Sequence, residues 1–177
     1  MKKVLTLTLL FVPFIFIALS CKSAGEQEEF YFSNFDEVEH YFIKIDEHEI
    51  YPLLDNLENE KNRALIDYIL EDYPEDIEDS SIIKNLNIAG YTSQPVDKSK
   101  HEALNNLFKK KKHEEVYALA CIAEYRDILL FYSEQKLVGL AKICFSCDQH
   151  WIIGTEVNTA NFGMSGDYRK LYELLYK

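Results

Sequence analysis

The sequence has few glycines and prolines, few positive charges and almost no long hydrophobic runs. Six glycines and four prolines among 177 residues exclude a collagen-like or low-complexity chain. Nineteen lysines and arginines stand against 30 aspartates and glutamates, a formal charge of −11, so a nucleic-acid partner is not expected. The length and the 47% hydrophobic content instead predict one globular domain.

The one long hydrophobic run lies at the N-terminus. Two lysines precede residues 4–19, which are apolar except for two threonines and Pro13. A basic start followed by an apolar stretch is typical of a secretory signal, and this stretch is shorter than the roughly 20 residues that span a bilayer. We therefore predict that residues 1–20 are a signal peptide. The alternative is a membrane anchor that ends in an ordinary buried Cys21.

The apolar stretch ends in Ala18-Leu19-Ser20-Cys21, which resembles the lipobox of bacterial lipoproteins. Ser20 matches the small residue that this family has directly before its cysteine, whereas the two residues before Ser20 differ from the commonest pattern. The resemblance implies that Cys21 carries acyl chains that anchor the protein to a bacterial membrane, with the outer membrane favoured. Residues 21–29 are small and polar, as expected of a tether, and residues 30–177 form the predicted single domain.

Charge is unevenly distributed along the predicted mature chain, whose net charge is −13. Residues 22–80 contain 19 acidic and four basic side chains, a net charge of −15, while residues 81–177 contain 11 acidic and 13 basic side chains. The acidic half could bind a basic protein. A simpler explanation of its charge is that it keeps the surface solvated and repels an anionic membrane. The lysines at 109–112 suit the negative end of the helix dipole at the C-terminus of a helix, and the alternative is that they bind nucleic acid or lipid headgroups.

Hydrophobic periodicity and turn residues predict an α+β fold, an antiparallel sheet with three or four helices. The clearest hairpin turns at Glu134-Gln135, and both of its arms are almost continuously apolar, as in strands that are covered on both faces. Two capping-box pairs, Asp55 with Glu58 and Ser99 with Glu102, are predicted to start helices. The expected strands are 38–45, 91–96, 116–123, 127–133, 137–145 and 151–153, and the other expected helices are 80–88, closed by Gly90, and an amphipathic C-terminal helix capped by Ser165 or Asp167.

Three cysteines remain in the body of the chain if Cys21 carries lipid: Cys121, Cys144 and Cys147. Export would place them in an oxidising compartment, where a disulfide is expected. Folding the hairpin pairs residues whose numbers sum to about 269, which brings Cys121 closer to Cys147 than to Cys144. We therefore predict a disulfide between Cys121 and Cys147, with Cys144 as a buried free thiol.

Three other uses of these cysteines stay open. Cys144 and Cys147 form a Cys-x-x-Cys pair, which suggests thiol–disulfide redox chemistry. Cys121, Cys144, Cys147 and His150 could together bind zinc or copper. Cys147 could be a nucleophile with His150 as its base and Asp148 as orienter. No serine-hydrolase, phosphate-loop or zinc-protease motif is present in the sequence, so we expect neither an enzyme nor a cofactor.

The C-terminal third of the chain resembles uncharacterised small lipoproteins and secreted proteins of Bacteroidota, in the segments 125–129, 143–147, 161–163 and 165–168. The resemblance implies no reaction, but it groups Arg126 and Asp127 with the three cysteines. Asn158 and Asn161 lie in the longest small-polar loop, 154–166, and loops of this length often bind ligands. These four residues, Arg126, Asp127, Asn158 and Asn161, are the candidate binding residues.

The sequence therefore favours a membrane-anchored lipoprotein of the cell envelope that acts as a non-enzymatic binding protein. One alternative is an acidic inhibitor or immunity lipoprotein that neutralises a basic toxin through the residue 22–80 region. Another is a thiol redox or metal-handling protein that uses the Cys-x-x-Cys pair.

Overall fold

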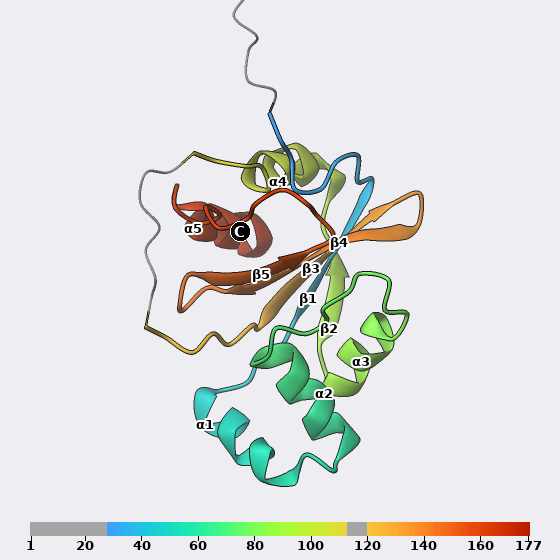
Figure 1. The fold of residues 1–177 in the computed structure, drawn as a ribbon, viewed down its shortest axis with the longest axis vertical. Helices are drawn as coiled ribbons and strands as arrows, with labels where there is room; N and C mark the ends of the chain where they lie inside the picture. Colours follow the sequence, from blue (N-terminus) through green and yellow to red (C-terminus); the bar gives the residue numbers. More distant parts are fainter. Residues whose placement is uncertain (1–27, 113–119) are drawn as a thin grey trace, which may run out of the picture.

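The computed structural model describes residues 28–112 and 120–177. These residues contain one antiparallel sheet with the strand order β2-β1-β3-β4-β5 (Figure 1). The predicted signal peptide, Cys21, most of the predicted tether and part of the predicted strand 116–123 lie outside the described residues. The strands are β1 (Glu37–Phe42), β2 (Thr92–Pro95), β3 (Asp127–Ser133), β4 (Lys136–Cys144) and β5 (Gln149–Ile153).

Helices cover both faces of the sheet (Figure 1). One face carries α1 (Glu47–Ile50), α2 (Glu60–Ile69) and α3 (Ile82–Ala89), and the other carries α4 (His101–Leu107) and α5 (Asp167–Tyr176). The predicted α+β class is confirmed, but the expected helix number was too low because five helices are present among the described residues. The short α1 is a single four-residue turn, too short to produce a helical period in the sequence.

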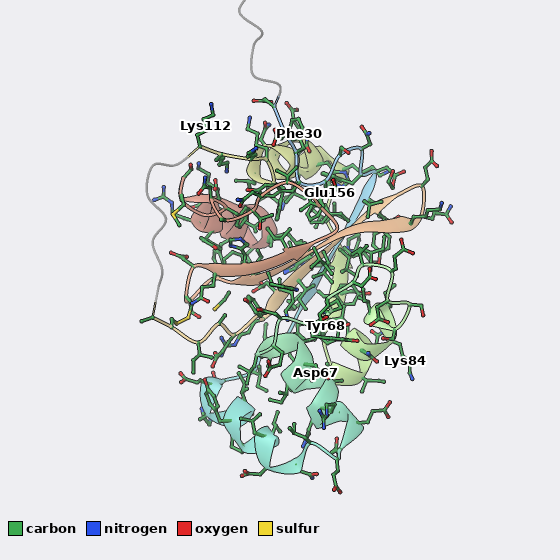
Figure 2. All side chains as sticks on the ribbon, viewed as in Figure 1. Phe30, Asp67, Tyr68, Lys84, Lys112 and Glu156 are labelled. Carbon is green, nitrogen blue, oxygen red and sulfur yellow. A yellow bond between two sulfur atoms is a disulfide. The ribbon has the colours of Figure 1, made fainter. Side chains whose placement is uncertain are left out.

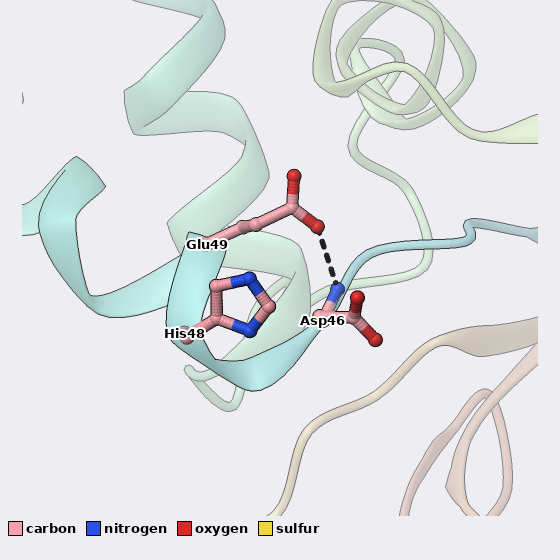
Figure 3. Close-up of side chains that lie close together, drawn as sticks. All are labelled: Asp46, His48 and Glu49. Atoms are coloured by element: carbon pink, nitrogen blue, oxygen red, sulfur yellow. Dashed lines mark hydrogen bonds between the residues drawn. The ribbon is translucent and has the colours of Figure 1, made fainter.

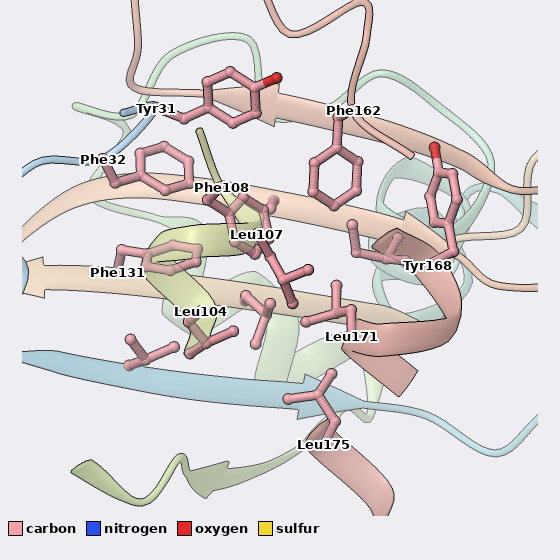
Figure 4. Packing of buried hydrophobic residues seen from close by; sticks show 14 residues of the cluster. Tyr31, Phe32, Leu104, Leu107, Phe108, Phe131, Phe162, Tyr168, Leu171 and Leu175 are labelled. Atoms are coloured by element: carbon pink, nitrogen blue, oxygen red, sulfur yellow. The ribbon is translucent and has the colours of Figure 1, made fainter. Parts of the chain in front are cut away.

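Successive side chains of the central strands point alternately into two hydrophobic clusters, one on each face of the sheet, which explains why both arms of the hairpin are apolar. Leu129 and Phe131 on β3 face α4 and α5, where they pack in a cluster that is rich in aromatic rings (Figure 4). Ile128 and Leu130 on the same strand face α2 and α3. The polypeptide before β1 lies on the α4 side, because the Tyr31 N–H donates to the carbonyl of Phe108 at 2.8 Å.

Both predicted capping boxes are wrong. The cap of α2 is Asn59, whose Oδ1 accepts hydrogen bonds from the N–H groups of Lys61 and Asn62 at 3.0 and 3.1 Å. Asp55 lies instead inside a 3-10 turn, Tyr51–Asn56. The second box fails because Asp97, not Ser99, caps the 3-10 turn Lys98–Lys100, which leads directly into α4. A capping side chain reaches only the first exposed N–H groups, so a shift of a few residues changes which residue caps.

The C-terminal helix is confirmed, but neither Ser165 nor Asp167 caps it. The cap position is Gly166, with a φ of 71°, and Asp167 is the first helical residue. The Asp167 carboxylate instead accepts a hydrogen bond from the N–H of Gly163 and pairs with Lys111 at 2.5 Å. The helix 80–88 with Gly90 behind it is also confirmed, as α3 with a left-handed cap at a φ of 95°.

The predicted hairpin is confirmed, with a register one residue different from the prediction. Glu134 and Gln135 have positive φ values of 48° and 64°, as a two-residue hairpin turn requires. Asp127 lies opposite Ile143 rather than Lys142, because a β-bulge between Phe131 and Tyr132 shifts the pairing. Residues 120–123, the described end of the predicted strand 116–123, are not a strand. The two residues that follow also donate their N–H groups outside the sheet, Glu124 to Cys144 Sγ and Tyr125 to the carbonyl of Ile69.

Candidate functional site

A groove of about 510 Å³ lies at the end of the sheet where β1 leaves and β3 begins. One wall is the β1–α1 connection, another is the start of β3, and the third is the last two turns of α5. Two of the four predicted binding residues, Arg126 and Asp127, are therefore brought together here. The lining residues are Ile43, Lys44, Ile45, Asp46, Glu49, Arg126, Asp127, Tyr172 and Tyr176.

A buried hydrogen-bond network holds Asp127 beneath α5. His40 Nε2 and the Tyr176 hydroxyl both bond to Asp127 Oδ1, at 2.7 and 2.5 Å. The Gln94 amide nitrogen lies 3.3 Å from His40 Nδ1. Both nitrogens of the buried imidazole therefore have protein partners, which leaves it unsuited to act as a general base.

The Asp127 network also fixes the Tyr176 ring at the groove. Burial, and then the hydrogen bond to Asp127, raise the pKa of the Tyr176 hydroxyl well above its ordinary value. The hydroxyl therefore remains a donor throughout the physiological range, and α5 stays attached to β3.

Arg126 is held against the groove wall by two contacts. Its Nε donates to the carbonyl of Ile45 at 2.9 Å, and its terminal nitrogen forms an ion pair with Glu124. The carbonyl of Arg126 accepts a hydrogen bond from the N–H of Ile43 at 3.0 Å. The guanidinium is thus a fixed part of the wall and its charge is compensated by Glu124.

The acidic wall of the groove comes from the start of α1 (Figure 3). Glu49 Oε2 accepts a hydrogen bond from the Asp46 N–H at 3.0 Å, which completes a capping box for α1. The ligand atoms of Asp46, His48 and Glu49 lie within 4.8 Å of one another, and all three residues are exposed. The capping box accounts for the positions of the two carboxylates, so their proximity alone does not indicate a metal site.

Two tyrosine rings from α5 lie half-exposed at the groove. Tyr172 is 46% exposed and Tyr176 is 43% exposed, with ring centroids 4.8 Å apart. Phe145 packs edge-on against Tyr172 at 5.3 Å, and His40 packs edge-on against Tyr176 at 5.5 Å. The rings are supported from both sides, so their orientation is set before any ligand arrives.

The predicted Cys121–Cys147 disulfide is present, with the two Cα atoms 6.0 Å apart, and Cys144 is a buried free cysteine as predicted. The structure does not assemble the alternative metal site. Cys121 and Cys147 are bonded to each other, and the neighbouring positions Cys144 and His150 point to opposite faces of the sheet. The Cys147 sulfur is part of this disulfide, so it is not the free thiol that the nucleophile alternative requires.

His150 has a structural role on the α5 face. Its Nδ1 lies 2.8 Å from the Tyr168 hydroxyl, and its ring packs edge-on against Phe162 at 5.1 Å. Burial lowers the pKa of His150, because the charged imidazolium would be poorly solvated there. The neutral ring can therefore accept a hydrogen bond from the Tyr168 hydroxyl, and this contact joins β5 to α5.

Asn158 and Asn161 do not line the groove. Asn158 Oδ1 accepts a hydrogen bond from the N–H of Ala160 at 2.8 Å, inside the same loop. The Asn161 amide donates to the carbonyl of Lys111 at 2.8 Å. Both side chains hold the loop 154–166 in place, which is a sufficient reason for their presence.

Lys142 is a buried charged residue that the sequence analysis did not single out. Its side chain is fully buried, and its ammonium donates to the carbonyls of Glu71 and Tyr73 at 2.5 and 2.8 Å. The ammonium also lies 4.6 Å from the centre of the Tyr125 ring. Burial lowers the pKa of Lys142 to about 7 despite the nearby carboxylates. The available signal in the sequence was a single lysine within the predicted apolar strand 137–145.

A scan against protein-family models and searches of curated proteins and of solved structures found no match to this chain. Among residues 28–112 and 120–177, no helix is long and apolar enough to cross a membrane.

Proposed function

We propose that this protein is a lipoprotein of a bacterial cell envelope, anchored through acyl chains on Cys21, and that its folded domain is a non-enzymatic binding protein. The groove at Arg126 and Asp127 is the observation that carries the binding role. It combines a concave space of about 510 Å³ with fixed aromatic rings and a few convergent polar groups, which are the general features of ligand sites.

The Cys121–Cys147 disulfide supports the envelope location. Disulfides persist in exported proteins and are rare in the reducing cytosol. The basic and apolar start of the chain and the lipobox-like residues before Cys21 point the same way. An outer-membrane anchor remains the favoured form of this proposal.

The arrangement of charge supports a second candidate, an acidic inhibitor or immunity lipoprotein that neutralises a basic toxin. Residues 46–89, which contain α1, α2 and α3, carry 13 acidic and three basic side chains. Phe30 lies beside α4, whereas Asp67 lies on α2, on the opposite side of the sheet (Figure 2). A tether that joins at residue 28 would therefore leave the acidic layer facing away from an anionic membrane.

Metabolic labelling tests the anchor. We expect the full chain, expressed in a bacterium that is fed an alkyne analogue of palmitate, to incorporate label and to fractionate with membranes. Cys21→Ala should abolish both, while Cys144→Ala, a matched change at a buried free cysteine, should keep both. Labelling that survives in Cys21→Ala would refute lipidation at this residue.

Site-specific photo-crosslinking tests the binding role. A benzophenone amino acid at position 172 should give a discrete adduct in intact cells, because Tyr172 is exposed at the groove. The same probe at Leu54, which has a similar exposure of 42% but does not line the groove, should not. Equal adducts at both positions would count against a groove-specific partner.

A further inference from the structure

The carboxylates of the groove are not balanced by cations of the protein. No described residue forms an ion pair with Asp46 or Glu49, while the one guanidinium in the wall, that of Arg126, is already paired with Glu124. Lys44 is the remaining positive side chain in the lining. The groove therefore presents an excess of negative charge to any ligand.

Asp127 adds a buried carboxylate to the same space. Its side chain is 9% exposed, and Oδ1 makes the hydrogen bonds of this carboxylate with His40 and Tyr176. Within the part of the chain that the structure describes, no group donates to Oδ2. Oδ2 is not one of the fully buried oxygens that lack a partner, so it is open to the groove. A carboxylate oxygen that the protein leaves without a donor there favours a ligand that can donate a hydrogen bond, and most of all a charged one.

The two tyrosine rings favour the same class of ligand. Exposed aromatic faces attract cations, with a typical gain of about 0.5–1 kcal/mol at exposed sites. Tyr172 and Tyr176 are both half-exposed and line the same groove as Asp46 and Glu49 of the α1 wall. Aromatic rings and carboxylates in one groove match a flat cation that can stack and donate several hydrogen bonds at once.

We propose that the groove binds the basic side chains of a protein or peptide partner, with arginine preferred over lysine. The planar guanidinium stacks on tyrosine and donates in pairs to carboxylates, whereas the ammonium of lysine is a compact, strongly hydrated charge. The volume of about 510 Å³ is much larger than a metal ion needs and accommodates a side chain with its neighbours. This inference rests on the proposed binding function and specifies the chemistry of its partner.

Peptide binding to the purified lipidated protein in detergent micelles tests the inference. The probes are fluorescent hexa-arginine, hexa-lysine and hexa-serine peptides, with affinity measured by fluorescence anisotropy at near-physiological salt. We expect hexa-arginine to bind more tightly than hexa-lysine and hexa-serine not to bind. Absence of hexa-arginine binding, or equal affinity for arginine and lysine, would overturn the proposal.

Matched variants locate the binding. Asp46→Asn with Glu49→Gln keeps atoms that can cap α1 and should weaken hexa-arginine binding about fivefold to tenfold, as the loss of two ion pairs predicts. Asp55→Asn with Glu58→Gln removes the same charge from exposed positions outside the groove and should change affinity by less than about twofold. Equal losses in the two variants would show diffuse attraction to the acidic surface and would overturn the site.

Position 172 tests the aromatic contribution without disturbing the core. Tyr172→Phe keeps the ring and should keep most of the affinity, while Tyr172→Leu removes it and should lose about threefold to fivefold. Equal affinities would exclude stacking at Tyr172. A groove-specific crosslink at position 172 without any preference for arginine would leave the binding function standing and refute only this inference, so the two failures are distinguishable.

Discussion

The two faces of the sheet bury charges of opposite sign and compensate for them differently. On the α4–α5 face, two carboxylates are buried with charged or strongly polar partners. Asp127 bonds to His40 and Tyr176, and Asp167 pairs with Lys111. On the α2–α3 face, the buried cation Lys142 is held by two backbone carbonyls and an aromatic ring. Burial lowers the pKa of Lys142, and the attraction of nearby carboxylates offsets this only in part.

The hydrophobic packing also differs between the faces. On the α4–α5 face, Phe131 packs against Phe32 and Phe108 with centroids 4.4 and 5.0 Å apart. On the α2–α3 face, most of the buried side chains are aliphatic, as Leu86 and Leu130 are. Large rings interlock and leave large cavities when removed, so the aromatic face should be the more sensitive to truncation.

The largest effect is expected from truncation of the aromatic face. Phe131→Ala should lower the free energy of unfolding by about 4 kcal/mol, and Leu130→Ala, the adjacent residue on the other face, by about 3 kcal/mol. Urea denaturation followed by circular dichroism measures both. A larger loss for Leu130→Ala would reverse the comparison between the two faces.

Loss of the disulfide should come next. Cys121 and Cys147 are 26 residues apart, and opening a loop of this size costs about 3 kcal/mol in the chain-entropy model. We expect this loss for the double change Cys121→Ser with Cys147→Ser, and for the wild type under reducing conditions. Reductant should have no effect on the stability of the double variant, and peptide mapping without reduction should recover Cys144 as a free thiol.

The buried cation should make stability depend on pH. Because the folded pKa of Lys142 is about 7 and its ordinary value is 10.5, the unfolded chain holds a proton between these values that the folded protein has released. The free energy of unfolding should therefore rise with pH, by about 2 kcal/mol between pH 7 and pH 9, and level off below pH 7. Lys142→Met should remove this rise in urea denaturation. The same rise in Lys142→Met would show that another group causes it.

The smallest effect is expected at the cap of α2. Asn59→Ala removes the acceptor for two backbone N–H groups and should cost about 1 kcal/mol. Glu58→Ala, one residue earlier and exposed, should cost less than about 0.5 kcal/mol. Thermal unfolding of the two variants distinguishes the observed cap from the one that the sequence pattern predicts.

Local pattern predicted most of the elements of the sheet. The alternation around residue 40, the turn at Glu134-Gln135 and the apolar arms on either side of it correspond to β1, β3 and β4. The disulfide could be predicted because the numbers of two residues that pair in a hairpin add up to a nearly constant sum. The bulge shifts the hairpin register by one residue from the predicted one. This shift did not change the predicted pairing of Cys121 with Cys147, since disulfides form over a range of Cα–Cα distances, about 4.4–6.8 Å.

The candidate site was only half predictable. Arg126 and Asp127 stand together in the sequence, but Tyr172 lies on an amphipathic helix that buries Tyr168, Leu171 and Leu175, and no sequence pattern separates it from them. Asp46 and Glu49 are two among 30 acidic residues and carry no distinguishing pattern. They become part of a site because α1 and the last turns of α5 reach the same end of the sheet.

The α+β class, the cysteine pairing and the concentration of acidic residues in the first half of the chain were predictable from the sequence, since each depends on neighbours or on simple periodicity. Only the folded protein shows which acids share a groove with Tyr172 and Tyr176, which side chain caps each helix, and that Lys142 is buried. Those features depend on where separate elements meet, and contacts between residues such as His40 and Asp127, 87 positions apart, leave no periodic trace in the chain.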